Sequence, residues 1–255
     1  SAQELVDRLG AAFHERQVYR IDHYLAKETA QNILTFRFHN PFFEETWNRR
    51  FIKKIVIRAT ETIGIEGRAT FYEQTGALRD LIQSHLLQLL ALITMEQPAQ
   101  LSSASIHTEK LRLLNAVVPP QLNDVAKSAI RGQYAGYKDE VAKPSTNTET
   151  YAAIQLEIDN ERWKGVPIIL ETGKALSEKN TSATLTYTHP DHPADKENTL
   201  SIQLQPNEGI SLGMWVKRPG LDTVMEVAEM DFRYQRAVAR IEEGVARLRG
   251  PASLQ

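Results

Sequence analysis

Apolar side chains recur along the chain at two different periods, and these periods predict its helices and strands. Over residues 4–13 and 106–117 they fall three or four residues apart, as on one face of a helix. A helix is also predicted over residues 24–36, before the Asn40-Pro41 pair, because the residue before proline is pushed out of the helical region. The broad apolar face of residues 76–96 predicts the longest and most buried helix.

Segments rich in β-branched or alternating residues predict strands. The first covers residues 52–60, and a turn follows at residues 64–67. Beyond Pro119-Pro120, segments of strand length follow one another near residues 128–134, 151–158, 167–173, 182–188, 199–205, 210–217 and 222–234. No helix is visible between these strands, so the sequence predicts an α+β fold with a large, mainly antiparallel β-sheet packed against helices.

Composition and charge narrow the class of protein. The 255 residues are 42% hydrophobic and 24% charged, enough for one large domain or two modest ones, which excludes disorder over most of the chain. The net charge of −2 gives no general attraction to nucleic acid or to an anionic membrane. The basic run Arg49, Arg50, Lys53 and Lys54 lacks stacking aromatics, so it is interpreted as the charged face of a strand.

Several kinds of site and segment are not expected. The sequence has no cysteine, which excludes disulfides and thiolate metal sites and favours a cytoplasmic location. Residues 86–95 are apolar but far shorter than the roughly 20 residues of a membrane span. No secretory signal is visible, and the N-terminus begins inside an amphipathic helix, as a domain cut from a longer chain would. The motif His189-Pro190-Asp191-His192 lacks a third convergent ligand, so we expect a loop and no metal.

The densest cluster of reactive side chains is Arg20-Ile21-Asp22-His23-Tyr24-Leu25-Ala26-Lys27-Glu28, at the start of the second predicted helix. A helix N-terminus favours anions, and His23, Tyr24 and Lys27 add three donors there. This combination suits a phosphate monoester. The alternative is that Asp22 is the N-cap of a solvated helical turn.

A second cluster, residues 79–85, lies on the long predicted helix. Asp80 and His85 are five residues apart, which in an α-helix separates them by about 140° around the axis. Asp80 is therefore a poor partner for His85, and a distant carboxylate such as Asp22 is a better one. Histidine within an apolar helical face is also common as a core residue, so the pattern leaves both interpretations open.

The first cluster closely resembles the signature of the glucose-6-phosphate dehydrogenase family. Ten further segments follow in the order of that family, over residues 1 to about 235. They are Gln31-Asn32, Trp47-Asn48-Arg49, Glu66-Gly67-Arg68, Arg79-Asp80, His85-Leu86-Leu87-Gln88, Met95-Glu96, Gly132-Gln133-Tyr134, Asn160-Glu161-Arg162-Trp163-Lys164-Gly165-Val166-Pro167, Gly173-Lys174-Ala175-Leu176 and Gln205-Pro206-Asn207-Glu208.

The resemblance implies a fold and a domain organisation. Residues 1–235 would form a substrate-binding and dimerisation domain built on a nine-stranded antiparallel sheet. Residues 236–255 would form a short helical tail, shorter than the corresponding region of the family. The resemblance also implies a homodimer or homotetramer joined through the sheet, and a Rossmann domain that binds NADP and is not in this chain.

The family's activity is the oxidation of glucose 6-phosphate to 6-phosphogluconolactone, with NADP as hydride acceptor, in the pentose phosphate pathway of the cytoplasm. By resemblance, His85 is the general base and Asp22 orients it. His23, Tyr24 and Lys27 hold the phosphate. Residues that surround the sugar or its phosphate are Glu61, Asp80, Lys174, Lys179 and Gln205. Without the cofactor domain, the isolated chain is expected to be inactive.

A second hypothesis is a sugar-phosphate-binding or oligomer-forming relative that no longer catalyses the reaction. The presence of Asp22, Lys27 and His85 together favours the dehydrogenase, because a purely structural relative need not keep a base. The length of the open reading frame upstream of Ser1 would separate the two.

Overall fold

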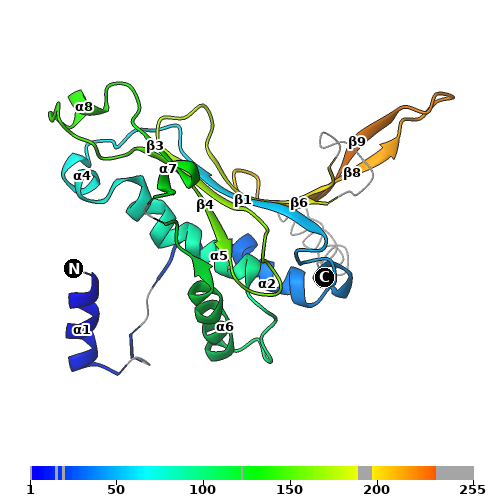
Figure 1. The fold of residues 1–255 in the computed structure, drawn as a ribbon, viewed down its shortest axis with the longest axis horizontal. Helices are drawn as coiled ribbons and strands as arrows, with labels where there is room; N and C mark the ends of the chain where they lie inside the picture. Colours follow the sequence, from blue (N-terminus) through cyan, green and yellow to red (C-terminus); the bar gives the residue numbers. More distant parts are fainter. Residues whose placement is uncertain (1, 15–16, 19–20, 122, 189–196, 234–255) are drawn as a thin grey trace, which may run out of the picture.

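One large β-sheet lies over a layer of helices in the computed structural model, which describes residues 2–14, 17–18, 21–121, 123–188 and 197–233 (Figure 1). The described residues form a nine-stranded sheet in the order β2-β4-β5-β1-β6-β7-β8-β9, with β3 also paired to β4. The strands are β1 (Ile52–Thr60), β2 (Val117–Val118), β3 (Ala129–Gly132), β4 (Tyr151–Ile158), β5 (Ile168–Gly173), β6 (Asn180–Tyr187), β7 (Thr199–Gln205), β8 (Gly209–Lys217) and β9 (Met225–Arg233). The predicted α+β class is confirmed.

The sheet is mainly antiparallel, as the sequence predicts, and the pairing of β1 with β5 makes it mixed. β1 pairs with β5 in parallel, with Ile55 opposite Ile168, and with β6 in antiparallel. More than a hundred residues separate β1 from β5 in the sequence, and the intervening helices supply the crossover that a parallel pair needs. The sequence also missed β2: Val117 and Val118 pair with β4 instead of ending the preceding helix.

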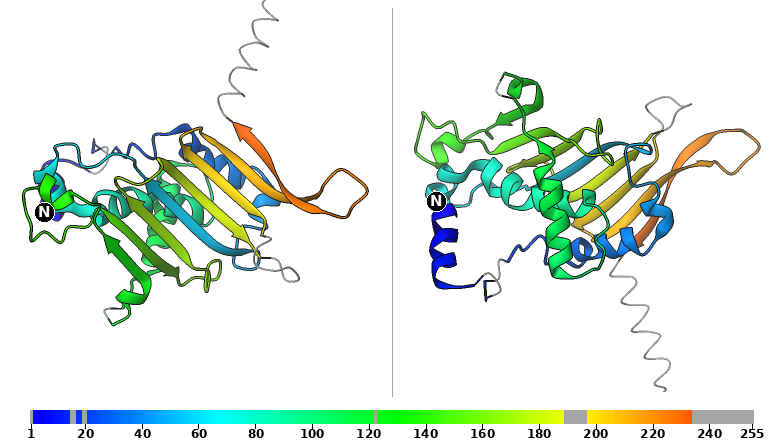
Figure 2. Two further views of the ribbon diagram at one scale, coloured as in Figure 1. Left: turned by 90° about the horizontal axis from the view of Figure 1, so that it is seen from above. Right: turned by 60° about the horizontal axis from the view of Figure 1, so that its bottom comes forward.

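The helices are α1 (Ala2–Ala12), α2 (Glu28–Phe38), α3 (Pro41–Glu44), α4 (Ala69–Ala77), the π-helix η2 (Leu78–Leu86), α5 (Leu87–Thr94), α6 (Ser103–Asn115), α7 (Val125–Ser128) and α8 (Tyr137–Glu140). Figure 2 shows α2, α5 and α6 side by side under one face of the sheet. None of the helices among the described residues has the length and hydrophobicity needed to cross a membrane. The predicted tail helix and the His189–His192 loop lie outside the described residues.

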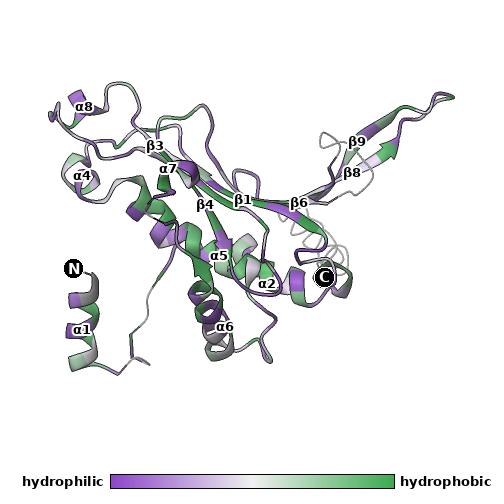
Figure 3. Ribbon diagram, viewed as in Figure 1, coloured by the Kyte–Doolittle hydropathy of each residue, from purple (hydrophilic) through white to green (hydrophobic). Residues whose placement is uncertain are grey.

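The core lies between this helix layer and the sheet. Residues 89–93 of α5 are hydrophobic, as the green colouring in Figure 3 shows, and they are buried in one cluster with Ile55 and Ile57 of β1 and Leu170 of β5. The sequence correctly identified this segment as the most buried helix. It did not show that the first half of the segment is a π-helix.

Buried side chains donate hydrogen bonds to the backbone carbonyls at the C-terminal end of α5. Trp47 Nε1 donates to Ile93 O and Trp163 Nε1 donates to Thr94 O, both at 2.7 Å. The fully buried Arg37 donates to Leu92 O at 3.0 Å and to Met95 O at 2.9 Å. The last carbonyls of a helix have no partner within the helix, so these donors satisfy groups that burial would otherwise leave unbonded. They fix the end of the segment that carries η2.

Candidate active site

The π-helix η2 brings Asp80 and His85 to the same side of the helix. A π-helix closes its hydrogen bonds between residues five apart, so residues i and i+5 lie about one turn apart. The α-helical separation of about 140° therefore does not apply, and this premise of the sequence analysis is wrong. Its conclusion about the partner of His85 is nevertheless confirmed, because the bonded carboxylate is Asp22.

The start of η2 is set by Gly76 and the buried Glu149. Gly76, next to the last residue of α4, has φ 64° and ψ 175°, so the helical backbone is interrupted just before η2. The Glu149 carboxylate accepts a hydrogen bond from Leu78 N at 3.0 Å, and a Cβ atom at position 76 would collide with this carboxylate. Ala77 N also donates to Glu149 O at 2.9 Å. Only glycine suits this position, because both the positive φ and the close approach exclude a side chain.

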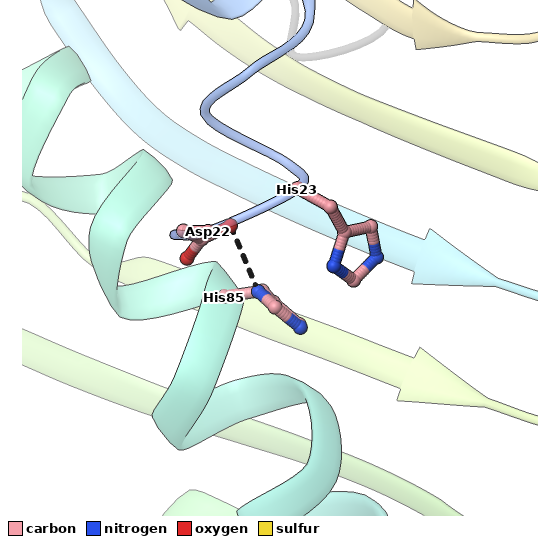
Figure 4. A group of neighbouring side chains, drawn as sticks. All are labelled: Asp22, His23 and His85. Atoms are coloured by element: carbon pink, nitrogen blue, oxygen red, sulfur yellow. Dashed lines mark hydrogen bonds and ion pairs between the residues drawn. The ribbon is translucent and has the colours of Figure 1, made fainter. Parts of the chain in front are cut away.

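Three contacts to one oxygen atom, Oδ1, hold the Asp22 carboxylate in place. Its Oδ1 atom lies 3.0 Å from His85 Nδ1 (Figure 4). The same oxygen accepts hydrogen bonds from Tyr24 N at 2.8 Å and Leu25 N at 3.3 Å. Asp22 thus holds the turn that precedes α2, as the N-cap alternative expected, although α2 itself begins only at Glu28 and not at Tyr24. It therefore both supports the backbone and orients the imidazole.

This contact determines which nitrogen of His85 can accept a proton. An ionised carboxylate only accepts hydrogen bonds, so Nδ1 of the neutral imidazole carries the hydrogen and Nε2 carries the lone pair. The His85 and Asp22 side chains are 17% and 18% exposed, so the pair is shielded but can be reached by a ligand. This arrangement of an orienting carboxylate and an imidazole is suited to general base catalysis.

Aromatic rings enclose the imidazole. The Tyr24 ring stacks on His85 with centroids 4.5 Å apart and 24° between planes, and the exposed His23 ring meets His85 edge-on at 4.5 Å. Burial, followed by the negative charge of Glu61, raises the pKa of Tyr24 to about 12. The Tyr24 hydroxyl therefore stays protonated near neutral pH and can donate a hydrogen bond.

Asp22, His23 and His85 are also the kinds of residue that bind metals. Their potential ligand atoms all lie within 4.8 Å of one another. Asp22 Oδ1 is already engaged by His85 Nδ1 and by two backbone N–H groups. The geometry of the pair is thus accounted for by hydrogen bonds within the protein, which orient the imidazole.

Two lysines approach one another at the start of α2. Burial, opposed by Glu208 and aided by the positive charge of Lys179, lowers the pKa of Lys27. Glu208 accepts hydrogen bonds from Thr29 Oγ1 at 2.8 Å and from Thr29 N at 3.4 Å. Lys27, at the N-cap position, makes no side-chain cap, so Glu208 bonds this helix end instead. The two ammonium groups beside a helix N-terminus suit a dianionic ligand.

A third group of residues extends the site across the sheet. Buried Lys174 forms an ion pair with Glu61, and its Nζ lies 5.6 Å from the centroid of the buried Tyr72 ring. The charge of Asp80 acts on the hydroxyls of both Tyr24 and Tyr72 and contributes to raising their pKa values.

Hydrogen bonds, ring contacts, ion pairs and electrostatic interactions connect most of the residues proposed from the sequence. Gln205 is linked to them only through the backbone, because it pairs in the sheet with Thr181, whose side chain hydrogen-bonds Tyr24. The sequence analysis did not single out Tyr72, Glu149 or Thr181. Each lies in an ordinary helix, loop or strand pattern, so no local signal marks it. Glu208 was named only as part of a family motif.

Comparison with known protein families gives two matches. Residues 34–248 match the family described as "Glucose-6-phosphate dehydrogenase, C-terminal domain", and residues 1–32 match "Glucose-6-phosphate dehydrogenase, NAD binding domain". The two matches meet within α2, so Asp22, His23, Tyr24 and Lys27 lie in the part of the chain that matches the NAD binding domain family. His85 and the other cluster residues come from the first.

Curated relatives agree with these matches. The chain is 39% identical to glucose-6-phosphate 1-dehydrogenase of Borreliella burgdorferi, over 97% of this chain and 56% of the relative. It is 42% identical to the enzyme of that name from Chlamydia muridarum, over 92% of this chain and 50% of the relative. The chain thus spans about half the length of these relatives.

Solved structures give the same result. A structure described as glucose-6-phosphate dehydrogenase in complex with its substrate glucose-6-phosphate matches with a TM-score of 0.86 and 36% identity, over 93% of this chain and 51% of that one. The glucose-6-phosphate 1-dehydrogenase of Mycobacterium avium matches with a TM-score of 0.82 and 32% identity, over 91% of this chain and 52% of that one. From the sequence, the fold and these matches together, the chain belongs to the glucose-6-phosphate dehydrogenase family.

Proposed function

We propose that this chain is the substrate-binding and catalytic-base part of a glucose-6-phosphate dehydrogenase, which oxidises glucose 6-phosphate to 6-phosphogluconolactone. The observation that carries the proposal is the 3.0 Å contact between Asp22 Oδ1 and His85 Nδ1, which leaves Nε2 free to take a proton. A purely structural or binding relative would not need an oriented base, so this contact favours the enzyme over the non-catalytic alternative.

In the proposed reaction, His85 Nε2 takes the proton of the C1 hydroxyl as the C1–H bond breaks. The hydride leaves C1, the C1–O bond becomes the carbonyl of the lactone, and the proton resides on the imidazole. Asp22 stabilises the resulting imidazolium and keeps the ring in place. The remaining sugar contacts are assigned to Glu61, Asp80, Lys174 and Gln205.

The phosphate is assigned to the other end of the cluster. His23, Tyr24, Lys27 and Lys179 surround the start of α2, where helix N–H groups and two ammonium charges favour an anion. The lowered pKa of Lys27, which burial causes, is consistent with a lysine that lacks a fully compensating negative charge and gains one from the phosphate of its ligand.

We place the NADP site, which supplies the hydride acceptor, on a cofactor domain outside this chain. The sequence contains no G-x-G-x-x-G segment to hold a pyrophosphate, so the residues present do not fit the dinucleotide. The relatives are about twice as long, and the apolar stripe of α1 is exposed, with Leu5 60% and Val6 42% accessible, as for a surface that packs against another domain. We therefore expect the chain alone not to reduce NADP.

The proposals for the oligomeric state and the cellular location rest on fewer observations. The outermost strand β9 carries exposed apolar residues, among them Met225 and Val227, which supports a homodimer or homotetramer joined through the sheet. The absence of cysteine and the name of one relative, "Glucose-6-phosphate 1-dehydrogenase 5, cytoplasmic", of Arabidopsis thaliana, support a cytoplasmic enzyme of the pentose phosphate pathway.

Calorimetric titration of the chain tests the proposal. Glucose 6-phosphate is expected to bind and glucose to give little heat, because the phosphate contacts lie on this chain. Adding NADP to the mixture should produce no NADPH absorbance. Absence of any response at millimolar glucose 6-phosphate would count against the assigned site.

A further inference from the structure

A polar pocket with a volume of 420 Å³ lies where α4 joins η2. Its walls are formed by Thr75 of α4, by Leu78 and Arg79 of η2, by Arg131 of β3 and by the loop of residues 143–149 before β4. None of the residues assigned to glucose 6-phosphate from the sequence lines this pocket. It is therefore a separate candidate site in the described part of the chain.

Three cationic side chains line this pocket. Arg79 is exposed and donates a hydrogen bond to Gln74 O at 3.3 Å. Lys143 Nζ lies 3.0 Å from Glu73 Oε2, and the Lys143 side chain is 58% exposed. The third cation is Arg131, and Glu149 is the carboxylate among the described lining residues. Positive charge thus exceeds negative charge on the walls.

Arg131 has no side-chain hydrogen bond or ion pair with any other described residue. It stands opposite Ala152 in the antiparallel pair of β3 and β4, and opposed residues point to the same face of a sheet. Ala152 is fully buried in the core cluster, so Arg131 points to the face of the sheet that the helices cover. Its charge is therefore available to a ligand on the side where η2 lies.

Side-chain hydrogen bonds hold the loop of residues 143–149 in shape. Gln133 Nε2 donates to Thr146 O at 3.1 Å and to Thr148 O at 2.9 Å. Thr146 Oγ1 donates to Glu73 Oε1 at 2.6 Å, and Thr148 Oγ1 donates to Glu73 O at 3.2 Å. A ligand need not order this loop, so binding avoids that entropic cost.

The charges of the pocket favour an anion over a metal ion. Glu149 is 8% exposed, and its carboxylate already accepts a hydrogen bond from Leu78 N at 3.0 Å. A metal ion would compete with this bond and face three like charges. Guanidinium groups, in contrast, bind phosphate and carboxylate groups through paired hydrogen bonds, and lysine adds a point charge.

We propose that this pocket binds a small multivalent oxyanion, held by Arg79, Arg131 and Lys143. Three cations favour a ligand with more than one negative charge, which both polyphosphates and polycarboxylates provide. The inference is independent of the proposed enzymatic activity, because none of these three residues contacts glucose 6-phosphate in that proposal.

Calorimetric titration of the full chain with pyrophosphate, and separately with citrate, tests the proposal. Both titrations use about 0.15 M ionic strength, where weak surface attraction is screened. They are repeated in a chain that carries Lys27→Ala and Lys179→Ala, which removes the cations at the start of α2. Arg131→Ala and Arg131→Lys are then added to this background. The matched control is Arg50→Ala, at an exposed arginine outside the pocket.

At least one probe is expected to bind once per chain, with similar affinity in the wild type and in the Lys27→Ala, Lys179→Ala background. Arg131→Ala should weaken this binding at least tenfold, because a charge-assisted contact is lost, and Arg131→Lys should weaken it less. Arg50→Ala should change it less than twofold. No heat from either probe at millimolar concentration would overturn the proposal. Loss of binding in the background, or equal effects of Arg131→Ala and Arg50→Ala, would also overturn it.

Thermal unfolding provides a second measurement on the same variants. A ligand that binds only the folded chain raises its melting temperature. Pyrophosphate or citrate, whichever binds, should raise the melting temperature of the background but not that of the background with Arg131→Ala. Because Arg131 is exposed, this substitution should not itself lower the melting temperature. An equal rise with and without Arg131→Ala would contradict the assigned site.

Discussion

At the scale of single residues, one hydrogen bond gives His85 its proposed role. Asp22 Oδ1 holds His85 Nδ1, and the Tyr24 ring stacks on the imidazole, so neither the tautomer nor the plane of the ring is free. The sequence could supply the residue types and, through family resemblance, their roles. It predicted Asp22 as the partner of His85, but it could not supply which nitrogen is bonded or at what distance, because 63 positions separate the two residues.

Lys27 offers a test of the phosphate site. Lys27→Ala should weaken binding of glucose 6-phosphate far more than Lys27→Arg, because a charge-assisted contact contributes about 1.5–3 kcal/mol. Since burial lowers the pKa of Lys27, wild-type affinity should also fall with rising pH earlier than for an ordinary lysine. Calorimetry at several pH values measures both effects.

Glucose is the control ligand for this experiment. Its weak binding should be nearly the same in both Lys27 variants, because it has no phosphate. If both variants lose glucose and glucose 6-phosphate binding to the same extent, Lys27 supports the fold instead of the ligand.

The pKa of Glu73 predicts how the stability of the fold responds to acid. Burial opposes ionisation, but hydrogen bonds from Thr146, Tyr137 and Lys143 outweigh it and lower the pKa of Glu73 to about 2, from an ordinary 4.5. A carboxyl whose pKa is lower in the folded state stabilises the protein above the unfolded pKa and loses this effect as pH falls through the folded pKa. The free energy of unfolding should therefore decline between pH 4.5 and 2.

Urea unfolding of Glu73→Gln across this range measures the contribution. The variant should be less stable than wild type at pH 6, and the difference should shrink towards pH 2. A difference that stays constant with pH would show that the charge of Glu73 is not involved.

At the scale of elements, the segment of residues 76–94 shows what a periodic pattern reveals and what it hides. Its apolar spacing correctly indicated a buried helix. The π-helical half was hidden, since it depends on Gly76 and on Glu149, which is distant in sequence and accepts the Leu78 N–H. This geometry brings Asp80 to the same side as His85.

The hydrogen bonds that buried side chains donate to the end of α5 can be tested by removing one donor. Trp163→Phe removes the donor to Thr94 O and leaves that carbonyl buried without its partner. The free energy of unfolding should fall by about 1–3 kcal/mol, which urea denaturation followed by circular dichroism would measure. Phe71→Leu, at a side chain that is 53% exposed, is the control and should change stability by less than about 0.5 kcal/mol. Equal losses in the two variants would contradict a capping role.

At the scale of the whole molecule, the sheet gathers side chains from distant segments into one site. Asp22 precedes α2, Glu61 follows β1, His85 lies on η2 and Lys174 follows β5. The alternating pattern predicted most of these strands within a few residues. The mixed sheet was not predictable in this way, because the parallel pairing of β1 with β5 depends on how the chain returns across more than a hundred residues.

The central claim is that His85 removes the proton from the C1 hydroxyl, and the most direct test is the turnover of His85→Asn in the enzyme with its cofactor domain restored. Asparagine keeps much of the bulk but cannot accept the proton, so turnover should fall roughly 10²- to 10⁴-fold with little change in affinity for glucose 6-phosphate. The melting temperature, measured on the same preparation, should stay close to that of the wild type. A folded His85→Asn enzyme with near-normal turnover would contradict the account.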